Sequence, residues 1–161
     1  MSSHELVVTP LETSHLEACG SIIGRSRFFQ EYGVKRDSLV ETLREGLEKP
    51  NYDLRVAQIS GTTVGFAWLV KRGSFDRSAY LRLIAVDENH LGHGIGRTLM
   101  ESLEEDYLKA TDMTLLVTSD NLSARAFYER LGYGYIGTLP DYVKPNVDEC
   151  LYFKAKKKHI S

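Results

Sequence analysis

A glycine-rich segment, which follows an apolar run and precedes an amphipathic one, carries the strongest chemical signal in this chain. Glycines stand at three alternate positions, Gly92, Gly94 and Gly96, and the residues that follow have helical periodicity. Glycine has no Cβ, so the backbone here can approach a ligand closely. The first amides of a helix have no partner within it and lie at the positive end of its dipole. The segment therefore predicts a cradle for a phosphate or a pyrophosphate.

Two common phosphate-binding patterns do not fit this segment. The dinucleotide pattern G-x-G-x-x-G would require a glycine at Arg97 or at Leu99. The nucleoside-triphosphate loop G-x-x-x-x-G-K-[ST] has no match either, because Arg97 again stands where its second glycine belongs. A nucleotide-binding regulator is therefore disfavoured.

A third pattern fits the glycine segment together with a second block downstream. The pair Gly94-x-Gly96 follows the strand-like run Leu83–Val86, and residues 121–133 read N-x-x-A-x-x-F-Y-x-x-x-G-Y. In this order the two blocks resemble the GCN5-related N-acetyltransferase (GNAT) family, over roughly residues 56–136. The resemblance implies an α/β fold with a mixed, mostly antiparallel sheet flanked by helices. It also implies acetyl-CoA as the acyl-donor cosubstrate and no metal.

The resemblance assigns coenzyme contacts to both blocks. The glycine loop would hold the pyrophosphate, and the strand before it would pair with the pantetheine arm. The residues concerned are Ile84, Ala85, Val86, Leu91, Gly92, His93, Gly94, Ile95, Gly96, Arg97, Asn121 and Tyr128. One position departs from the family pattern [QR]-x-x-G-x-[GA], because Leu91 stands at the Gln or Arg place. We expect a modest loss of affinity, since backbone amides do most of the phosphate binding.

Tyr128 matches the position of the family's general-acid tyrosine. When an amine attacks a thioester, the departing thiolate must collect a proton. A thiol titrates near about 8.5 and a phenol near about 10, so a tyrosine holds its proton until the thiolate forms. The other interpretation of Tyr128 is a core aromatic of its helix.

The general base has no comparable signal. Family members of the histone acetyltransferase type carry a glutamate where this chain has Tyr80, and ribosomal-protein acetyltransferases carry one where it has Leu116. An alkylammonium titrates near about 10.4, so its proton needs a route at neutral pH. The remaining options are Asp148, Glu149, Tyr80 and Glu88, or a chain of water molecules.

The segments that correspond to the family's acceptor pocket carry aromatic and acidic residues. The substrate-side assignments are Phe28, Phe29, Tyr32, Tyr80, Tyr142 and Glu149. Aromatic rings there could receive an apolar or a cationic group. Packing beneath a loop explains the same residues equally well.

Two functions from different classes follow. The first is direct acyl transfer from acetyl-CoA to a primary amine of a small molecule or of a peptide amino terminus, catalysed by an N-acetyltransferase. The second is a non-catalytic acyl-CoA-binding sensor or partner module. Neither Cys19 nor Cys150 adjoins the two blocks, which disfavours a cysteine nucleophile.

Composition is that of an ordinary globular chain. Its 161 residues, 42% of them hydrophobic, predict a single domain over residues 1–161 with a short basic tail at about 154–161. The net charge of −2 gives no general attraction to nucleic acid. Two distant cysteines and no apparent signal peptide indicate a cytoplasmic protein that does not bind membranes. A homodimer is left open.

The positioning elements follow from hydrophobic periodicity and turn residues. Ser60-Gly61 is expected to supply the turn of a hairpin, and Gly132 is expected to end the last helix. We expect an interrupting segment at residues 27–33, and a loop around Pro140 and Pro145. Thr13 and Asp37 are the expected caps of the first two helices, and Ser123 is one interpretation for the cap of the last. The expected strands are 6–8, 54–59, 64–70, 78–86, 113–118, 133–137 and 150–153, and the expected helices are 13–23, 37–47, 95–110 and 123–131.

Overall fold

The computed structural model describes residues 4–158, and the chain divides into two compact units. Unit 1 contains residues 4–69 and Leu83–Leu103, and unit 2 contains Val70–Arg82 and residues 104–158. The start of the chain and the end of the expected basic tail, residues 1–3 and 159–161, lie outside the described residues.

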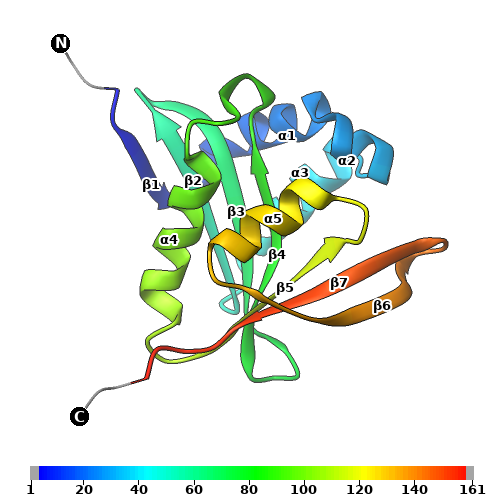
Figure 1. The fold of residues 1–161 in the computed structure, drawn as a ribbon. Coiled ribbons are helices and arrows are strands. Elements are labelled where there is room, and N and C mark those ends of the chain that lie inside the picture. The colour runs from blue at the N-terminus through cyan, green and yellow to red at the C-terminus, as the bar shows by residue number, and fades with distance from the viewer. Residues whose placement is uncertain (1–3, 159–161) are drawn as a thin grey trace. The chain divides into compact units, whose positions relative to one another are not determined.

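The strands form a seven-stranded sheet in the order β1-β2-β3-β4-β5-β7-β6 (Figure 1). β1 is antiparallel to β2, β5 is parallel to β4, and β7 is antiparallel to both β5 and β6. The expected mixed, mostly antiparallel α/β sheet is therefore confirmed. The strands are β1 (Leu6–Pro10), β2 (Tyr52–Ile59), β3 (Thr62–Ser74), β4 (Ser78–Val86), β5 (Met113–Thr118), β6 (Gly134–Lys144) and β7 (Val147–Lys154).

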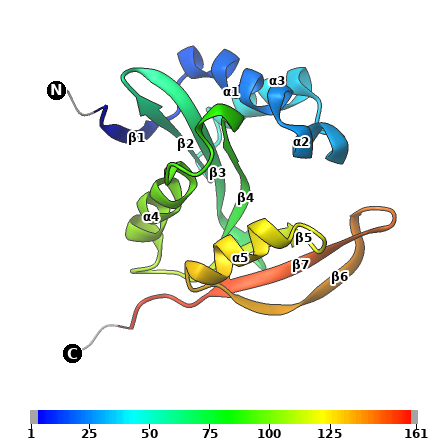
Figure 2. The ribbon, with the colours of Figure 1, turned by 45° about the horizontal axis from the view of Figure 1, so that its top comes forward.

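Five α-helices accompany the sheet in the described part of the chain, with short 3₁₀ turns η1 (Thr13–His15) and η2 (Glu88–His90). The α-helices are α1 (Leu16–Arg25), α2 (Arg27–Tyr32), α3 (Arg36–Gly46), α4 (Ile95–Tyr107) and α5 (Leu122–Arg130). In unit 1, α1 and α3 cover one face of β2 and β3, and the beginning of α4 covers the other (Figures 1 and 2). A Cβ added to Gly46 would lie 2.9 Å from Tyr52, and one added to Gly65 would lie 2.9 Å from Ile95. Helices α3 and α4 thus approach the strands closely.

The β2–β3 hairpin of unit 1 turns at Ser60 and Gly61, whose φ angles are +50° and +78°, as the sequence predicts. Next to it, Trp68 is buried against the ring of Tyr52, with 5.1 Å between the ring centroids. Residues 63–69 of β3 are all buried, so both faces of this strand are covered, and with Leu54, Val56 and Ala57 of β2 they supply the core of this unit.

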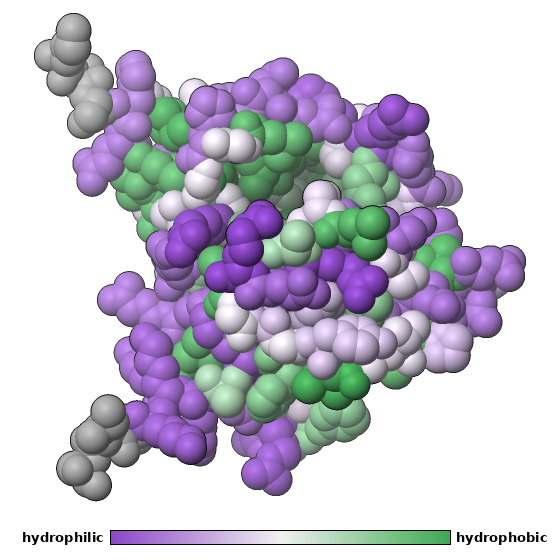
Figure 3. Space-filling view, viewed as in Figure 1, coloured by the Kyte–Doolittle hydropathy of each residue, from purple (hydrophilic) through white to green (hydrophobic). Residues whose placement is uncertain are grey.

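In unit 2, α5 ends as expected at Gly132, whose φ is +93°. The amide of Tyr133 donates to the carbonyl of Tyr128 at 3.0 Å, which closes the last turn. The β6 strand forms the outer edge of the sheet. It exposes Tyr135, Ile136, Tyr142 and Val143. On the face shown in Figure 3, hydrophobic side chains are exposed in separate patches among hydrophilic ones.

Two expected irregular segments are regular in the structure. The segment at residues 27–33 forms α2, because the Ser26 hydroxyl accepts from the amide of Phe29 at 3.4 Å and Gly33, with φ +91°, ends the helix. The expected loop around Pro140 is part of β6, where the register shifts between Leu139 and Lys144. Proline is tolerated on an edge strand and at a bulge because it need not donate to a neighbour there.

Both expected helix caps were wrong, and so was the alternative interpretation that gave the last cap to Ser123. Glu12 caps the 3₁₀ turn where Thr13 was expected, and Lys35 precedes α3 where Asp37 was expected. Asn121 caps α5, not Ser123. None of the helices in the described residues combines the length and the apolar character needed to cross a membrane.

Candidate active site

The glycine loop of unit 1 has the backbone conformation that close approach to a ligand requires. Gly92 and Gly94 have φ angles of +79° and +76°, in the left-handed region that other residues rarely adopt. A Cβ at either position would meet no atom within 4 Å. The space beside this backbone is therefore open. Leu91, at the position that departs from the family pattern, is 60% exposed.

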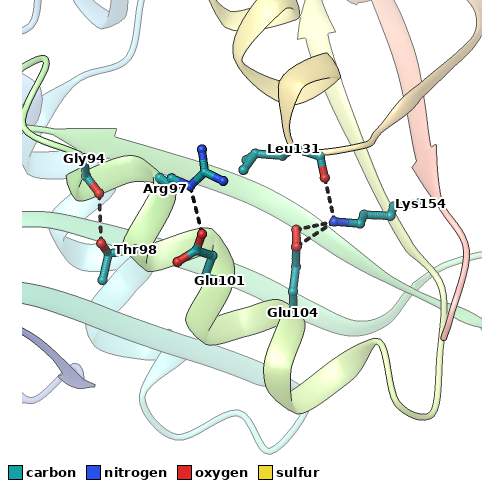
Figure 4. Close-up of polar contacts among 7 residues, drawn as sticks. All are labelled: Gly94, Arg97, Thr98, Glu101, Glu104, Leu131 and Lys154. Carbon is teal, nitrogen blue, oxygen red and sulfur yellow. Dashed lines mark hydrogen bonds and ion pairs between the residues drawn. The ribbon is translucent and has the colours of Figure 1, made fainter.

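Helix α4 begins immediately after this loop. The amide of Thr98 donates to the carbonyl of Gly94 at 3.0 Å, and the Thr98 hydroxyl donates to the same oxygen at 2.9 Å (Figure 4). The amides of Ile95, Gly96 and Arg97 precede this hydrogen bond, so no carbonyl within the helix can accept from them. With the helix dipole they create a positive partial charge of about half an elementary charge. This geometry suits a phosphate.

Arg97 lies along the exposed side of α4. Its Nε donates to a carboxylate oxygen of Glu101 at 2.8 Å (Figure 4). A guanidinium has five N–H donors, so this pair does not exhaust its capacity. His93 is exposed between the two left-handed glycines.

Asp87, which directly follows β4, makes several polar contacts before the glycine loop begins. Its side chain accepts from Arg25 Nη2 at 2.9 Å and from the amide of Asn89 at 3.1 Å. Its backbone amide donates to Val64 on β3, and its carbonyl accepts from the amide of His90, each at 2.8 Å. Asp87 is only 6% exposed, so these contacts stabilise a buried carboxylate. Sequence reasoning did not identify it, because an acidic residue after a strand is no motif.

Strand β4 leads to the glycine loop, and the backbone of its last residues is the part of it that concerns the site. Ala85 is buried, and its carbonyl lies 3.0 Å from the position of a Cβ added to Gly65. The β4–β5 register ends with Leu81 opposite Leu115. Ile84, Ala85 and Val86 therefore lie beyond the part of β4 that pairs with β5.

The aromatic residues of α2 form a cluster in unit 1. The rings of Phe28 and Tyr32 stack with 5.8 Å between centroids, and Phe28 meets Phe29 edge-on at 5.3 Å. Phe28 is exposed, whereas Phe29 and Tyr32 are half-buried. The structure thus brings three of the substrate-side residues together on one helix.

The second sequence block lies in unit 2, where Asn121 precedes α5 and Tyr128 lies within it. The side-chain oxygen of Asn121 accepts from the amide of Ala124 and from the hydroxyl of Ser123, both at 3.2 Å. Asn121 is therefore the N-cap of α5. Its amide nitrogen is the group that could donate to a ligand.

Tyr128 is buried near the end of α5 and meets Phe127 and Tyr133 edge-on, at centroid distances of 5.0 and 5.8 Å. Burial raises the pKa of the Tyr128 phenol well above its usual value near 10, because the charged phenolate loses solvation. The phenol therefore stays protonated throughout the physiological pH range.

A polar network fixes α5 from the side of β7. Arg125 Nε donates to the hydroxyl of Tyr152 at 3.0 Å, and that hydroxyl donates to a carboxylate oxygen of Glu129 at 2.8 Å. Arg125 also donates to the carbonyl of Ser119 at 3.1 Å. The periodicity of α5 gave no sign of these contacts, which depend on a strand that begins 17 residues after the helix ends.

Further substrate-side residues of unit 2 lie on β4, β6 and β7. Burial raises the pKa of Tyr80; the hydrogen-bonded Arg82 lowers it in part, and Glu149 and Tyr142 raise it further. Glu149 is 3% exposed, and the hydroxyl of Thr118 lies 3.5 Å from it. Tyr142 is exposed on the edge strand.

Asp148, next to Glu149 in the sequence, accepts hydrogen bonds from two backbone amides. Its side chain accepts from the amide of Asp141 at 3.2 Å, and its carbonyl accepts from the amide of Ser119 at 2.9 Å.

Both cysteines are buried free thiols. Burial raises the pKa of Cys19 to about 12, which keeps it in the unreactive thiol form. Within residues 4–158, no group of three or more His, Cys, Asp or Glu side chains could hold a metal ion.

Comparison with known proteins identifies the family to which this chain belongs. Residues 21–133, more than half of the chain, match the model of the acetyltransferase (GNAT) family. The chain belongs to the GNAT acetyltransferase family. In this GNAT protein the matched region contains the glycine loop and all of α5.

Two relatives share about a third of the aligned residues with this chain. One is an uncharacterised N-acetyltransferase of Methanocaldococcus jannaschii, 33% identical over 105 residues, which are 63% of this chain and 65% of that protein. The other is the N-alpha-acetyltransferase RimI of Mycobacterium tuberculosis, 31% identical over 99 residues, which are 61% of this chain and 62% of that protein. The chain thus spans less than two thirds of the length of each relative.

The fold is similar to that of the ribosomal-protein-S18-alanine N-acetyltransferase from Escherichia coli, with a TM-score of 0.78. The match covers 96% of both chains at 22% identity. It establishes a GNAT fold.

Proposed function

We propose that this protein is an acetyl-CoA-dependent N-acetyltransferase that transfers an acyl group directly to a primary amine. The observation that carries the proposal is the glycine loop with two left-handed glycines at the start of α4, in a chain of the acetyltransferase family. When bound, acetyl-CoA supplies an acyl group activated as a thioester. The residues of this chain bind it, orient it and move protons.

The proposed diphosphate site is the backbone of Gly92–Arg97. It is supported by the open space at Gly92 and Gly94 and by the unpaired first amides of α4. Leu91 contributes no charge, so the affinity depends on these amides and on Arg97. The backbone of Ile84, Ala85 and Val86 is the proposed partner for the pantetheine arm, as an added strand.

In unit 2, we assign the amide nitrogen of Asn121 to a hydrogen bond with a pantetheine carbonyl, because its oxygen already caps α5. Tyr128 is the proposed proton donor. The amine nitrogen forms a bond to the thioester carbon, the carbon–sulfur bond breaks, and the phenol protonates or hydrogen-bonds the departing sulfur. Where the phenol gives up its proton, the proton that the nitrogen loses on becoming an amide returns to it through water. Burial raises the pKa of Tyr128, so the phenol still carries its proton near pH 10, where much of the amine is free.

We propose that water accepts the proton that the acceptor ammonium must lose, and that no single carboxylate is essential as a base. Glu88 and Asp148 already accept backbone amides, from Arg27 and Asp141. Glu149, which is buried beside Thr118, is also proposed to lie on the acceptor side. Phe28, Phe29, Tyr32, Tyr80 and Tyr142 are proposed to contact the acceptor. The acceptor is a small amine or a peptide amino terminus, and the name of the mycobacterial relative supports the second.

The deciding experiment is a panel of primary amines incubated with acetyl-CoA, with free thiol and N-acetyl product both measured. The panel contains small amines and short peptides with free amino termini. We expect stoichiometric thiol and amide from at least one class. Coenzyme binding without turnover on any amine would instead indicate the non-catalytic acyl-CoA-binding module. Absence of coenzyme binding in calorimetry would refute the coenzyme site itself.

A further inference from the structure

The segment between β4 and the glycine loop is bonded to the junction of α1 and α2. Asp87 accepts from the Arg25 side chain at 2.9 Å, and Glu88 Oε1 accepts from the backbone amide of Arg27 at 2.9 Å. These two contacts join residues 61 and 62 positions apart in the sequence, and all the residues lie in unit 1. Neither contact is explained by phosphate binding or by acyl transfer.

The link between these contacts and the loop is short and stiff. Asp87 caps η2, whose first residue is Glu88. In this turn the amide of Asn89 donates to the Asp87 side chain and the amide of His90 donates to the Asp87 carbonyl. Leu91, the first residue of the loop, comes directly after. The backbone amide of Asp87 is fixed to β3 by its bond to Val64. A change in the loop therefore acts on Glu88 through a hydrogen-bonded turn.

At the other end of the contacts, α2 depends on tertiary support. It has six residues, too few for a helix that is stable alone in water. The Ser26 hydroxyl accepts from the amide of Phe29, and Glu88 accepts from that of Arg27. Of these two side-chain acceptors for the amides of its first turn, Glu88 thus comes from the segment that leads to the glycine loop. The same helix carries the aromatic cluster of Phe28, Phe29 and Tyr32.

We propose that Asp87 and Glu88 are positioning residues that couple the glycine loop to α2, so that a ligand in the loop orders the aromatic helix. The coupling rests on the proposed function, in which that ligand is coenzyme A and the aromatic helix is on the acceptor side. Glu88 acts through the backbone amide of Arg27, and Asp87 acts through the Arg25 guanidinium. In this scheme α2 is ordered only when coenzyme occupies the loop, and acetyl transfer follows that ordering.

Hydrogen exchange of the intact protein, with and without saturating coenzyme A, tests this coupling without a known acceptor. In the wild type, coenzyme should slow exchange of the amides of residues 91–97 and, by fivefold or more, those of α2. In Glu88→Ala, the loop should still be protected while the effect on α2 falls below twofold. Glu88→Gln should restore most of the effect, because its amide oxygen can accept from Arg27.

A second pair of variants isolates the amide hydrogen itself. Arg27→Pro removes the N–H that Glu88 binds, at the first helical position, where proline is well tolerated. Ser26 before it is extended, with φ −78° and ψ 116°, as a residue before proline requires. Arg27→Ala keeps the N–H and removes only the side chain, which is paired with Glu31. We expect Pro to uncouple α2 and Ala to leave it coupled.

The combined variant Arg27→Pro/Glu88→Ala should show no further loss of coupling, since both changes remove the same hydrogen bond. Full coenzyme-dependent protection of α2 in Glu88→Ala, or protection confined to the loop in the wild type, would overturn the coupling while leaving the coenzyme site intact. Absence of protection at the loop in the wild type would refute the coenzyme site, and the coupling with it.

Discussion

The side-chain ammonium of Lys154 donates a hydrogen bond of 2.6 Å to the backbone carbonyl of Leu131, immediately after α5. The same nitrogen donates to both carboxylate oxygens of Glu104, at 3.0 and 2.9 Å (Figure 4). It also lies 5.5 Å from the ring centroid of Tyr133. A cation is thus placed at the negative end of the helix that carries Tyr128. This contact was not expected, because the sequence predicts Lys154 to begin a solvated basic tail.

Lys154→Met should lower the free energy of unfolding by about 1.5–3 kcal/mol, because it leaves the buried Glu104 carboxylate without its charged partner. Urea unfolding measures this change. The double variant Glu104→Gln/Lys154→Met should lose less than the sum of the single variants. Strict additivity would show that the pair contributes no coupling energy.

Gly94→Ala should weaken coenzyme A binding by at least about tenfold, since its new Cβ enters the open space assigned to phosphate. Gly61→Ala is the matched control in the same unit, because Gly61 also has a left-handed φ of +78° and open space beside it. Both variants should lose about 1–2 kcal/mol of folding free energy from backbone strain. Calorimetry on the two folded variants separates the effects, and equal coenzyme affinities would refute the site.

Tyr128→Phe should reduce turnover by about ten- to ten-thousand-fold, the range for a general acid–base group. The ring and its packing remain, so coenzyme affinity should change little. Because burial raises the Tyr128 pKa above its usual value near 10, the wild-type rate should rise with pH as free amine accumulates, without a decline as pH approaches 10. Wild-type turnover in the variant, under conditions where chemistry limits the rate, would leave Tyr128 a packing residue.

Folding stability should fall as pH rises above about 9. The pKa of Cys19 is raised from 9.0 to about 12, and burial raises the pKa values of Tyr128 and Tyr133 above 10. Above these unfolded-state values, the unfolded chain releases protons that the folded chain retains, so stability is present at lower pH and lost on the alkaline side. Tyr133→Phe should flatten this decline in urea titrations, whereas exposed Tyr142→Phe should not. Parallel declines in both variants would contradict the assignment.

We expect three carboxylate variants, Glu149→Gln, Asp148→Asn and Glu88→Gln, each to retain more than about a hundredth of the wild-type rate. A loss of less than about a hundredfold is smaller than the losses in the upper range for removal of a positioned base. Asp148 and Glu88 have structural hydrogen bonds that the amides can partly reproduce. A near-complete loss in one variant alone, with folding and coenzyme binding intact, would identify that residue as the base.

Local signals predicted what depends on local chemistry. The Ser60-Gly61 turn, the bounds of β4 and β5, and the end of α5 at Gly132 all follow from turn residues and periodicity. Glycine at positions 92 and 94 permits the left-handed conformations found there. These features need no information about distant parts of the chain.

Features supported by distant partners could not be predicted in this way. Helix α2 is stabilised in part by Glu88, which lies 61 residues away from Arg27. The strand around Pro140 forms because β6 is the outermost strand, a property of sheet order and not of composition. Asn121 carried a family assignment, and only the structure shows that its oxygen caps α5.

The buried contact between Trp68 and Tyr52 gives the protein a built-in optical probe of unit 1. Trp68 is the single tryptophan of the chain, and of its nine tyrosines only Tyr32 and Tyr52 belong to unit 1, so the other seven belong to unit 2. Fluorescence excited beyond the tyrosine band therefore reports on one unit, while tyrosine absorbance reports mainly on the other. Superimposable denaturation curves from the two signals would mean that the units melt as one cooperative body, and separate curves would mean that each has its own melting transition.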